Sequence, residues 1–290
     1  MKGLGAWGVG LALTAAAVQA QQPVFRSGVD VVSIDVSVMN GNTAVSGLTI
    51  DKFVVTDNGV PQALDSISLD QVPLSLMLVL DTSGSLEGER LERLIDAASH
   101  LVKTLRADDA ASLLKFSEPI RLEVPMTVDR APLVDAIGRL EARGATTLND
   151  AVFFGLQLRP PDAAASRPVV LVFSDGHDTS SWLTNEQVLE AVRRSGATVH
   201  VVELVPDMYS RQSPFLARLA GAAGGRRWLA ASPNDLRNLF GRVLDELRAR
   251  YLLTYYPKGV TTEGWHDVTV TLKGARGDVT ARPGYYVAPR

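Results

Sequence analysis

The chain has 290 residues, of which 46% are hydrophobic and 21% are charged, and its formal net charge at neutral pH is −3. These values are typical of a globular protein with one large domain or two ordinary ones. No cluster of basic residues alternates with aromatic ones, so the chain does not indicate a nucleic-acid-binding protein. It contains no cysteine, which excludes disulfides, thiolate metal ligands and a cysteine nucleophile.

Residues 1–20 are predicted to be a secretory signal peptide. Lys2 precedes the uncharged apolar run Leu4–Val18, and Val18-Gln19-Ala20 has the small-x-small pattern of a cleavage site. We expect cleavage near Ala20 and export of the mature chain to the periplasm or the medium. The alternative is an uncleaved membrane anchor, for which this run is short. No later segment is long and apolar enough to cross a membrane.

Residues 24–71 are predicted to form a small β segment. From Val29 to Val38 the sequence alternates with one nearly all-apolar face, the pattern of a half-buried antiparallel strand. A second strand is expected at Phe53-Val54-Val55 and a third from Gln62 to Leu69. Between them Asp57-Asn58-Gly59 favours a hairpin turn.

Residues 72–249 change to strands alternating with helices, which predicts an α/β domain with a doubly wound, mostly parallel sheet. The region opens on the apolar run Leu74–Leu80, expected to be a strand buried on both faces. Residues 120–124 are expected to be an antiparallel edge strand. Further strands are expected at 110–116, 169–173, 198–204 and 227–229, and helices at 89–105, 130–140, 148–158, 185–195, 214–223 and from 233 to about 247.

Residues 250–288 return to β-strand patterns. We expect them to pair with residues 24–71 as a small β-sandwich, so that the α/β domain is inserted between two halves of one unit. The alternative is that these strands extend the α/β sheet.

Three polar loops follow predicted strands or precede a helix, and together they predict a metal site. The first carries Asp81, Ser83 and Ser85, the second is Gly144–Thr147, and the third is Ser174-Asp175-Gly176. Ligands of open α/β sheets bind beyond the carboxyl ends of the strands, where these loops should meet. Two carboxylates with several hydroxyls are hard oxygen donors that suit Mg²⁺ and leave it a position for a carboxylate of another protein.

Asp-x-Ser-x-Ser, then Gly-x-Thr, then Ser-Asp-Gly, in this order, resembles the pattern of von Willebrand factor A domains over Val72–Arg248. The resemblance implies a doubly wound fold with a metal-ion-dependent adhesion site. It makes Ser83 and Ser85 direct ligands, Thr146 a ligand in some states, and Asp81 and Asp175 mostly water-mediated anchors. Gly-Ala-Thr replaces the commoner Gly-Gly-Thr, so Thr147 is an alternative to the preferred Thr146. The flanking β segments are similar to bacterial exported "VWFA-related" proteins, which mostly lack an assigned function.

The sequence thus predicts an exported, non-enzymatic module that uses Mg²⁺ or Mn²⁺, rather than Ca²⁺, to bind an exposed Asp or Glu of an unidentified protein. The loops around Gly84, Thr147, Gly176 and His177 are expected to contact that partner. One alternative is a structural cell-envelope protein whose metal site is non-functional or only stabilising. A weaker one is a haloacid-dehalogenase-like phosphatase, since Ser83 stands where that chemistry needs a second acid.

Two further interpretations concern residues near the loops. We interpret His177 and Asp178 as solvated loop residues. Asp150 lies early in a predicted helix, where the helix dipole favours a carboxylate without any function.

Overall fold

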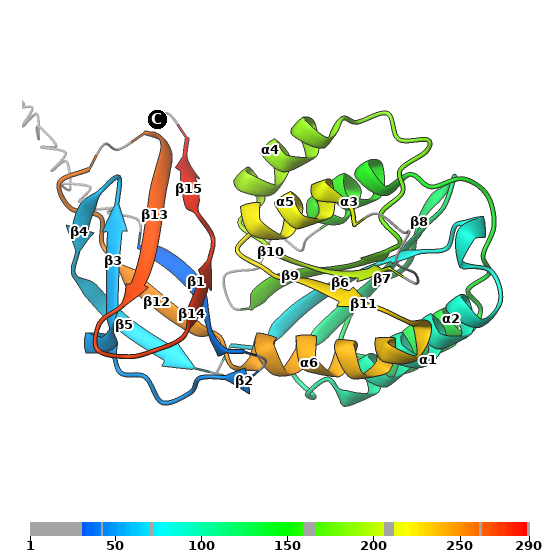
Figure 1. Ribbon diagram of the computed structural model, residues 1–290, viewed down its shortest axis with the longest axis horizontal. Coiled ribbons are helices and arrows are strands. Elements are labelled where there is room, and N and C mark those ends of the chain that lie inside the picture. Colours follow the sequence, from blue (N-terminus) through cyan, green and yellow to red (C-terminus); the bar gives the residue numbers. More distant parts are fainter. Residues whose placement is uncertain are drawn as a thin grey trace, which may run out of the picture.

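The structure, a computed structural model, describes residues 31–41, 43–69, 72–158, 166–205, 212–260 and 263–288. It consists of a sheet layered between helices and, beside it, a smaller unit of two antiparallel sheets (Figure 1). The predicted signal peptide, residues 1–20, lies outside the described residues. None of the helices in the described ranges is long and apolar enough to span a membrane.

The larger unit is built on a six-stranded sheet with the order β11-β10-β9-β6-β7-β8. All neighbours are parallel except β8, an antiparallel edge strand as predicted. Every residue of β6 is buried, because its apolar side chains point to both faces of the sheet. The strands are β6 Leu74–Asp81, β7 Ala110–Phe116, β8 Ile120–Thr127, β9 Arg167–Ser174, β10 Thr198–Leu204 and β11 Arg227–Ala230.

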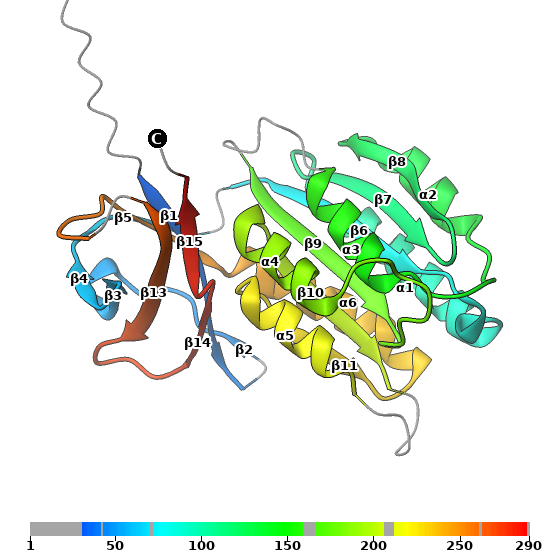
Figure 2. The same cartoon turned by 90° about the horizontal axis from the view of Figure 1, so that it is seen from above.

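Helices cover both faces of this sheet, which confirms the doubly wound α/β prediction (Figures 1 and 2). One face carries α1 Glu89–Thr104, α2 Arg130–Gly138 and α6 Leu236–Arg248, and the other carries α3 Leu148–Gln157, α4 Asn185–Ser195 and α5 Pro214–Ala222. The Thr184 and Gln187 side chains form a capping box at the start of α4. The predicted last helix begins with the 3₁₀ turn η4, Pro233–Asp235, before α6.

Each of the two sheets of the smaller unit contains strands from both the beginning and the end of the described chain. The first sheet contains β1 Val32–Asn40, β2 Thr43–Ala44, β5 Leu64–Leu69, β12 Tyr251–Tyr255 and β14 Asp278–Ala281. The second contains β3 Phe53–Asp57, β4 Val60–Gln62, β13 Gly264–Leu272 and β15 Gly284–Val287, with the 3₁₀ turn η1, Ile50–Lys52, before β3. The predicted β-sandwich is therefore confirmed, and the alternative that the last strands extend the α/β sheet is wrong. The exact domain boundaries at 71/72 and 249/250 stay predictions.

The hairpin at Asp57–Val60 forms as predicted, with Asn58 and Gly59 at φ 46° and 79°. The predicted single strand from Gln62 to Leu69 is instead two strands. β4 pairs with β3 in one sheet and β5 pairs with β12 in the other, so the chain crosses the sandwich between them. Alternating apolar residues do not reveal such a change of sheet.

Buried charges hold the sandwich against the α/β unit. Asp35 of β1 pairs with Arg250 (Oδ2 to Nε, 2.6 Å) and with Arg167 (Oδ1 to Nε, 3.0 Å). Arg250 is fully buried and also contacts Glu246 of α6 at 3.2 Å. Arg167 begins β9, so these contacts place the sandwich at the amino-terminal end of the parallel strands, away from their carboxyl ends (Figure 2).

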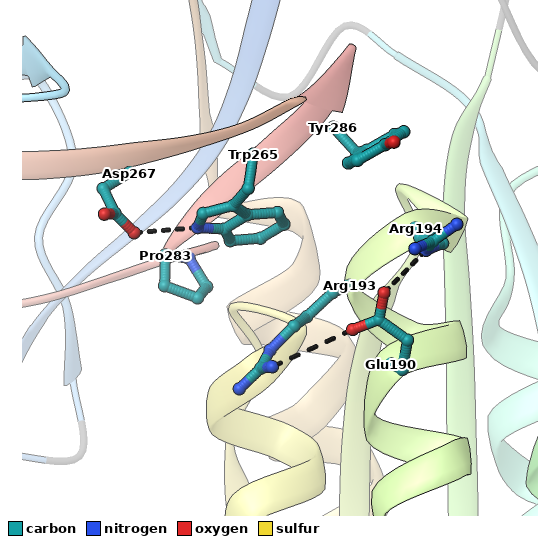
Figure 3. Close-up of a pocket in the computed structure, with 7 residues that line it drawn as sticks. All are labelled: Glu190, Arg193, Arg194, Trp265, Asp267, Pro283 and Tyr286. Atoms are coloured by element: carbon teal, nitrogen blue, oxygen red, sulfur yellow. Dashed lines mark hydrogen bonds and ion pairs between the residues drawn. The ribbon is translucent and has the colours of Figure 1, made fainter. Parts of the chain in front are cut away.

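A cleft of about 410 Å³ lies at this junction, between α4 and the sandwich. Trp265 and Tyr286 form its sandwich wall, and Glu190 pairs with Arg194 on the α4 side (Figure 3). Because α4 runs antiparallel to the strands, its last turn and this cleft are at the end of the sheet opposite to the three polar loops.

Candidate metal centre

Asp81, the last residue of β6, organises the first loop. Its side chain is fully buried and accepts hydrogen bonds from the backbone N–H of Ser83 at 2.9 Å and from the hydroxyl of Ser174 at 2.7 Å. The hydroxyl oxygens of Ser83 and Ser85 lie 3.1 Å apart. Ser83 is buried and Ser85 is exposed, so the hydroxyl pair reaches from the carboxylate to the surface.

The second loop is attached to the first by backbone hydrogen bonds. Gly84 N–H donates to the carbonyl of Gly144 at 3.0 Å, and Arg143 N–H donates to that of Thr82 at 2.9 Å. These bonds place Thr146 and Thr147, just before α3, beside the Asp81 loop.

The two threonines differ in what their hydroxyls do. Thr147 Oγ1 donates to the carbonyl of Ser117 at 2.5 Å, which commits this hydroxyl to holding the loop. The Thr146 hydroxyl forms no hydrogen bond with any residue in the described ranges, although the residue is only 5% exposed. The structure therefore favours Thr146 over Thr147 as the available oxygen donor.

The third loop brings Asp175 beside the first. Asp175 follows Ser174 directly, and its side chain is 9% exposed and lies 3.4 Å from Nδ1 of the exposed His177. Gly176 has φ +84°, and a Cβ there would lie 2.8 Å from that of Ser213. Only glycine fits this turn, which fixes where Asp175 is placed.

The electrostatics of the site are those of buried negative charge without a nearby cation. Burial raises the pKa of Asp81 to about 6; the charge of Asp175 acts in the same direction, and the hydrogen bonds from Ser83 and Ser174 oppose it. Within the described ranges no Lys or Arg forms an ion pair with either carboxylate.

The same ranges contain no group of three or more acidic or histidine side chains able to hold a metal. A cation here would therefore need the hydroxyls as well as the carboxylates. Hydroxyl and carboxylate oxygens with few charged ligands fit a small hard cation that retains water, so the donor set suits Mg²⁺.

Sequence reasoning missed the role of segment 178–183, which holds the second loop and the start of α3 through hydrogen bonds. Asp178 is exposed, but it is not the purely solvated residue that we predicted, because its carboxylate accepts from the backbone N–H of Asn149 in the first turn of α3 at 3.0 Å. The Asp150 carboxylate, interpreted as having no function, accepts from the N–H groups of Trp182 and Leu183 at 3.0 and 2.9 Å. A helix N-terminus capped from a distant loop has no signature in local sequence.

Glu203 of β10 is a second residue that sequence reasoning missed. It is fully buried and accepts from Ser213 N–H at 2.5 Å, and it pairs with Arg227 at 3.1 Å. Burial raises its pKa, against the effect of these partners. Glu203 thus holds the start of α5 behind Gly176. The only signal was a glutamate within an otherwise apolar strand.

The sheet and its loops define a domain of the von Willebrand factor type A class. Residues 76–177 match the family model described as "von Willebrand factor type A domain". The chain therefore contains such a domain, and the resemblance stated from the sequence is confirmed.

Relatives with related sequences cover only part of the chain. An uncharacterized protein of Synechocystis is 37% identical over 89 residues, 30% of this chain and 21% of that protein. The inter-alpha-trypsin inhibitor heavy chain H2 of Mus musculus is 24% identical over 142 residues, 44% of this chain and 15% of that protein. The matched segments are therefore small parts of both relatives.

Solved structures share the fold at low identity. A von Willebrand factor type A protein from Catenulispora acidiphila has a TM-score of 0.54 at 15% identity and covers 91% of this chain and 74% of its own. The vWF domain of the type V pili tip protein Mfa5 from Porphyromonas gingivalis has a TM-score of 0.50 at 12% identity, over 60% of this chain and 94% of its own.

Proposed function

We propose that this chain is an exported, non-enzymatic protein-binding module that captures an acidic side chain of a partner through a divalent cation held by the three loops. One observation carries the proposal: adjoining loops at the carboxyl edge of the sheet hold the Ser83–Ser85 hydroxyl pair, the Asp81 carboxylate, which forms no ion pair with a described Lys or Arg, and the Thr146 hydroxyl, which has no hydrogen-bond partner in the described ranges. Relatives with the same type of domain include a pilus tip protein, which supports a role in protein–protein interaction.

In this proposal Ser83, Ser85 and Thr146 provide direct ligands, and Asp81 and Asp175 anchor the ion through water. Mg²⁺ or Mn²⁺ is favoured over Ca²⁺, which takes more oxygen ligands than these loops offer. The bound cation supplies an electrophilic coordination position that a partner's carboxylate can occupy. The sandwich does not cover this edge, because it packs at the opposite end of the strands.

The surroundings of the two serines support a binding role rather than catalysis. An activated serine needs a base within hydrogen-bond reach. In the described part of the chain, the hydroxyl partner of Ser83 is Ser85, and the nearby His177 contacts Asp175 instead. A phosphatase of the haloacid-dehalogenase type would need an acid in place of Ser83.

The test is a selection of random displayed peptides on the immobilised mature chain, carried out in Mg²⁺ and in EDTA. We expect Mg²⁺-dependent peptides that share an Asp or Glu, and we expect replacement of that residue by its amide to abolish binding. Peptides that bind equally in EDTA, or that share no acidic residue, would contradict the proposal. The alternative of a structural envelope protein would then be favoured.

A further inference from the structure

Trp182 is the most solvent-exposed large hydrophobic residue in the described ranges. Its exposed fraction is 93%, whereas the next, Val128, is 59% exposed. Tryptophan is normally largely buried, as Trp228 is here at 4%. Single exposed apolar side chains need no explanation in general, so the argument depends on how Trp182 is held and where it lies.

The backbone that carries Trp182 is rigidly bonded. All five consecutive N–H groups from Thr179 to Leu183 donate hydrogen bonds, to the carbonyl of Thr146 and to the carboxylates of Asp178 and Asp150. Two of these acceptors, Thr146 and Asp150, are themselves buried. The loop thus presents an exposed indole from a fixed backbone, so little loop order has to be gained when a partner binds.

The same hydrogen bonds place this loop beside the candidate metal centre. The carbonyl of Thr146 accepts from the N–H groups of Thr179 and Ser180, each at 3.0 Å, and Thr146 N–H donates to the Thr179 hydroxyl at 2.9 Å. Asp150, whose carboxylate accepts from Trp182 N–H, lies in the first turn of α3, which begins two residues after Thr146. The loop that carries Trp182 is therefore hydrogen-bonded to the second of the three loops and to the first turn of α3 that follows it.

We infer that Trp182 is the apolar anchor of the partner-binding face, so that the partner presents an aliphatic, aromatic or proline surface next to the acidic residue that it offers to the metal. The inference rests on the proposed function and specifies its partner class. Tryptophan is among the commonest residues of binding hot spots, where one large side chain fills a desolvated pocket.

The charges around Trp182 favour a protein over a lipid surface. The charged residues nearest in the chain are Asp178 and Glu186, and the latter pairs with Arg218 at 3.1 Å. Membrane-surface binding is typically strengthened by Lys and Arg clusters that attract anionic lipids. This loop carries negative charge instead.

The experiment measures binding of the Mg²⁺-dependent acidic peptides to purified variants of the full mature chain. We expect Trp182→Ala to weaken binding by about tenfold or more, with little change in Tm or Mg²⁺ affinity, and Trp182→Phe to recover part of the loss. The matched control is Val128→Ala, which removes the next most exposed apolar side chain, beyond the end of β8 and at the opposite edge of the sheet, and should not change binding. The selected peptides should also share an apolar residue close to the acidic one.

The outcomes separate the inference from the function on which it rests. Metal-dependent acidic peptides that bind Trp182→Ala as well as wild type would overturn the inference and leave the proposed function standing. A selection without such peptides would contradict both. A blue shift of tryptophan emission with vesicles of phosphatidylcholine and phosphatidylglycerol, lost in Trp182→Ala and independent of Mg²⁺, would assign the side chain to a lipid surface and overturn the inference.

Discussion

The Ser174 hydroxyl donates a hydrogen bond to the Asp81 carboxylate, with 2.7 Å between the oxygens. These residues end the neighbouring strands β9 and β6 and are 93 positions apart in the chain. The bond joins the first and third loops without neutralising the carboxylate. The loops are therefore positioned by the fold itself, and no Lys or Arg in the described ranges pairs with the Asp81 charge.

Asp81→Asn is expected to stabilise the metal-free protein while removing its response to metal. The substitution keeps the shape of the side chain and an acceptor for Ser83 N–H, but it removes a buried charge that forms no ion pair with a Lys or Arg of the described ranges. We expect the free energy of unfolding in EDTA at pH 7.5 to rise by about 1–2 kcal/mol, measured by urea unfolding. A loss of stability on this substitution would show that the carboxylate is needed structurally.

Thr146 and Thr147 should respond in opposite ways to replacement by the isosteric valine. Thr147→Val removes a buried hydrogen bond to the Ser117 carbonyl and should cost about 1–3 kcal/mol of stability, with Mg²⁺ affinity retained. Thr146→Val removes a hydroxyl that forms no bond in the described structure, so stability in EDTA should hold while Mg²⁺ affinity falls. Each variant is the control for the other. The reverse pattern would assign the ligand to Thr147.

The junction between the two units should depend on Asp35. Asp35→Asn leaves Arg250 and Arg167 buried without their shared counter-ion, and we expect a loss of about 3–5 kcal/mol. Asp96→Asn is the matched control, because it breaks a half-exposed pair with Arg237 at the same kind of distance, 3.1 Å. That control should cost less than about 1 kcal/mol. Similar losses in both variants, measured by urea unfolding, would mean that the junction charges contribute little.

His200 should make the protein sensitive to acid. This residue is fully buried in β10, and burial holds its pKa well below the usual range, assisted by the positive charges of Arg250 and Arg226. The folded state therefore keeps His200 neutral where the unfolded state takes up a proton, below about pH 6.5. This contribution to stability is complete above that pH and is lost as the pH falls.

The check is the pH dependence of unfolding in EDTA. As the pH falls from 7.5 to 5, the free energy of unfolding of the wild type should decline. We expect that decline to be smaller by about 2 kcal/mol in His200→Leu. His177→Ala serves as the control, since its side chain is 66% exposed. An unchanged slope for His200→Leu would show that another group causes the acid sensitivity.

Local pattern was sufficient to predict most of the fold. The apolar run Leu74–Leu80 predicted β6, and the helix predicted at 185–195 is α4. Such features depend on residues close together in sequence, whose periodicity and capping chemistry are visible in one chain. The change of sheet between Gln62 and Leu64 was missed, because both strands have the same alternating pattern.

The candidate site could be predicted only in part, for the same physical reason. The three loops were identified because each is a short polar segment at a strand end or before a helix. Their bracing was not, since the Asp178 cap on α3 and the Asp150 bonds to Trp182 join residues about thirty positions apart. Thr146 was already preferred from the sequence, but the physical reason against Thr147 needed the structure, because it depends on where the Thr147 hydroxyl points.

The central claim is that the three loops bind a divalent cation, and calorimetric titration of Mg²⁺ into the EDTA-stripped mature chain tests it most directly. We predict single-site binding with wild type, weaker binding of Ca²⁺, and none with Asp81→Asn, which should still fold. A corresponding Mg²⁺-dependent rise in Tm should appear only in wild type, because a ligand that binds the folded state alone stabilises it. No heat and no Tm shift at millimolar Mg²⁺, or equal binding by Asp81→Asn, would contradict the account.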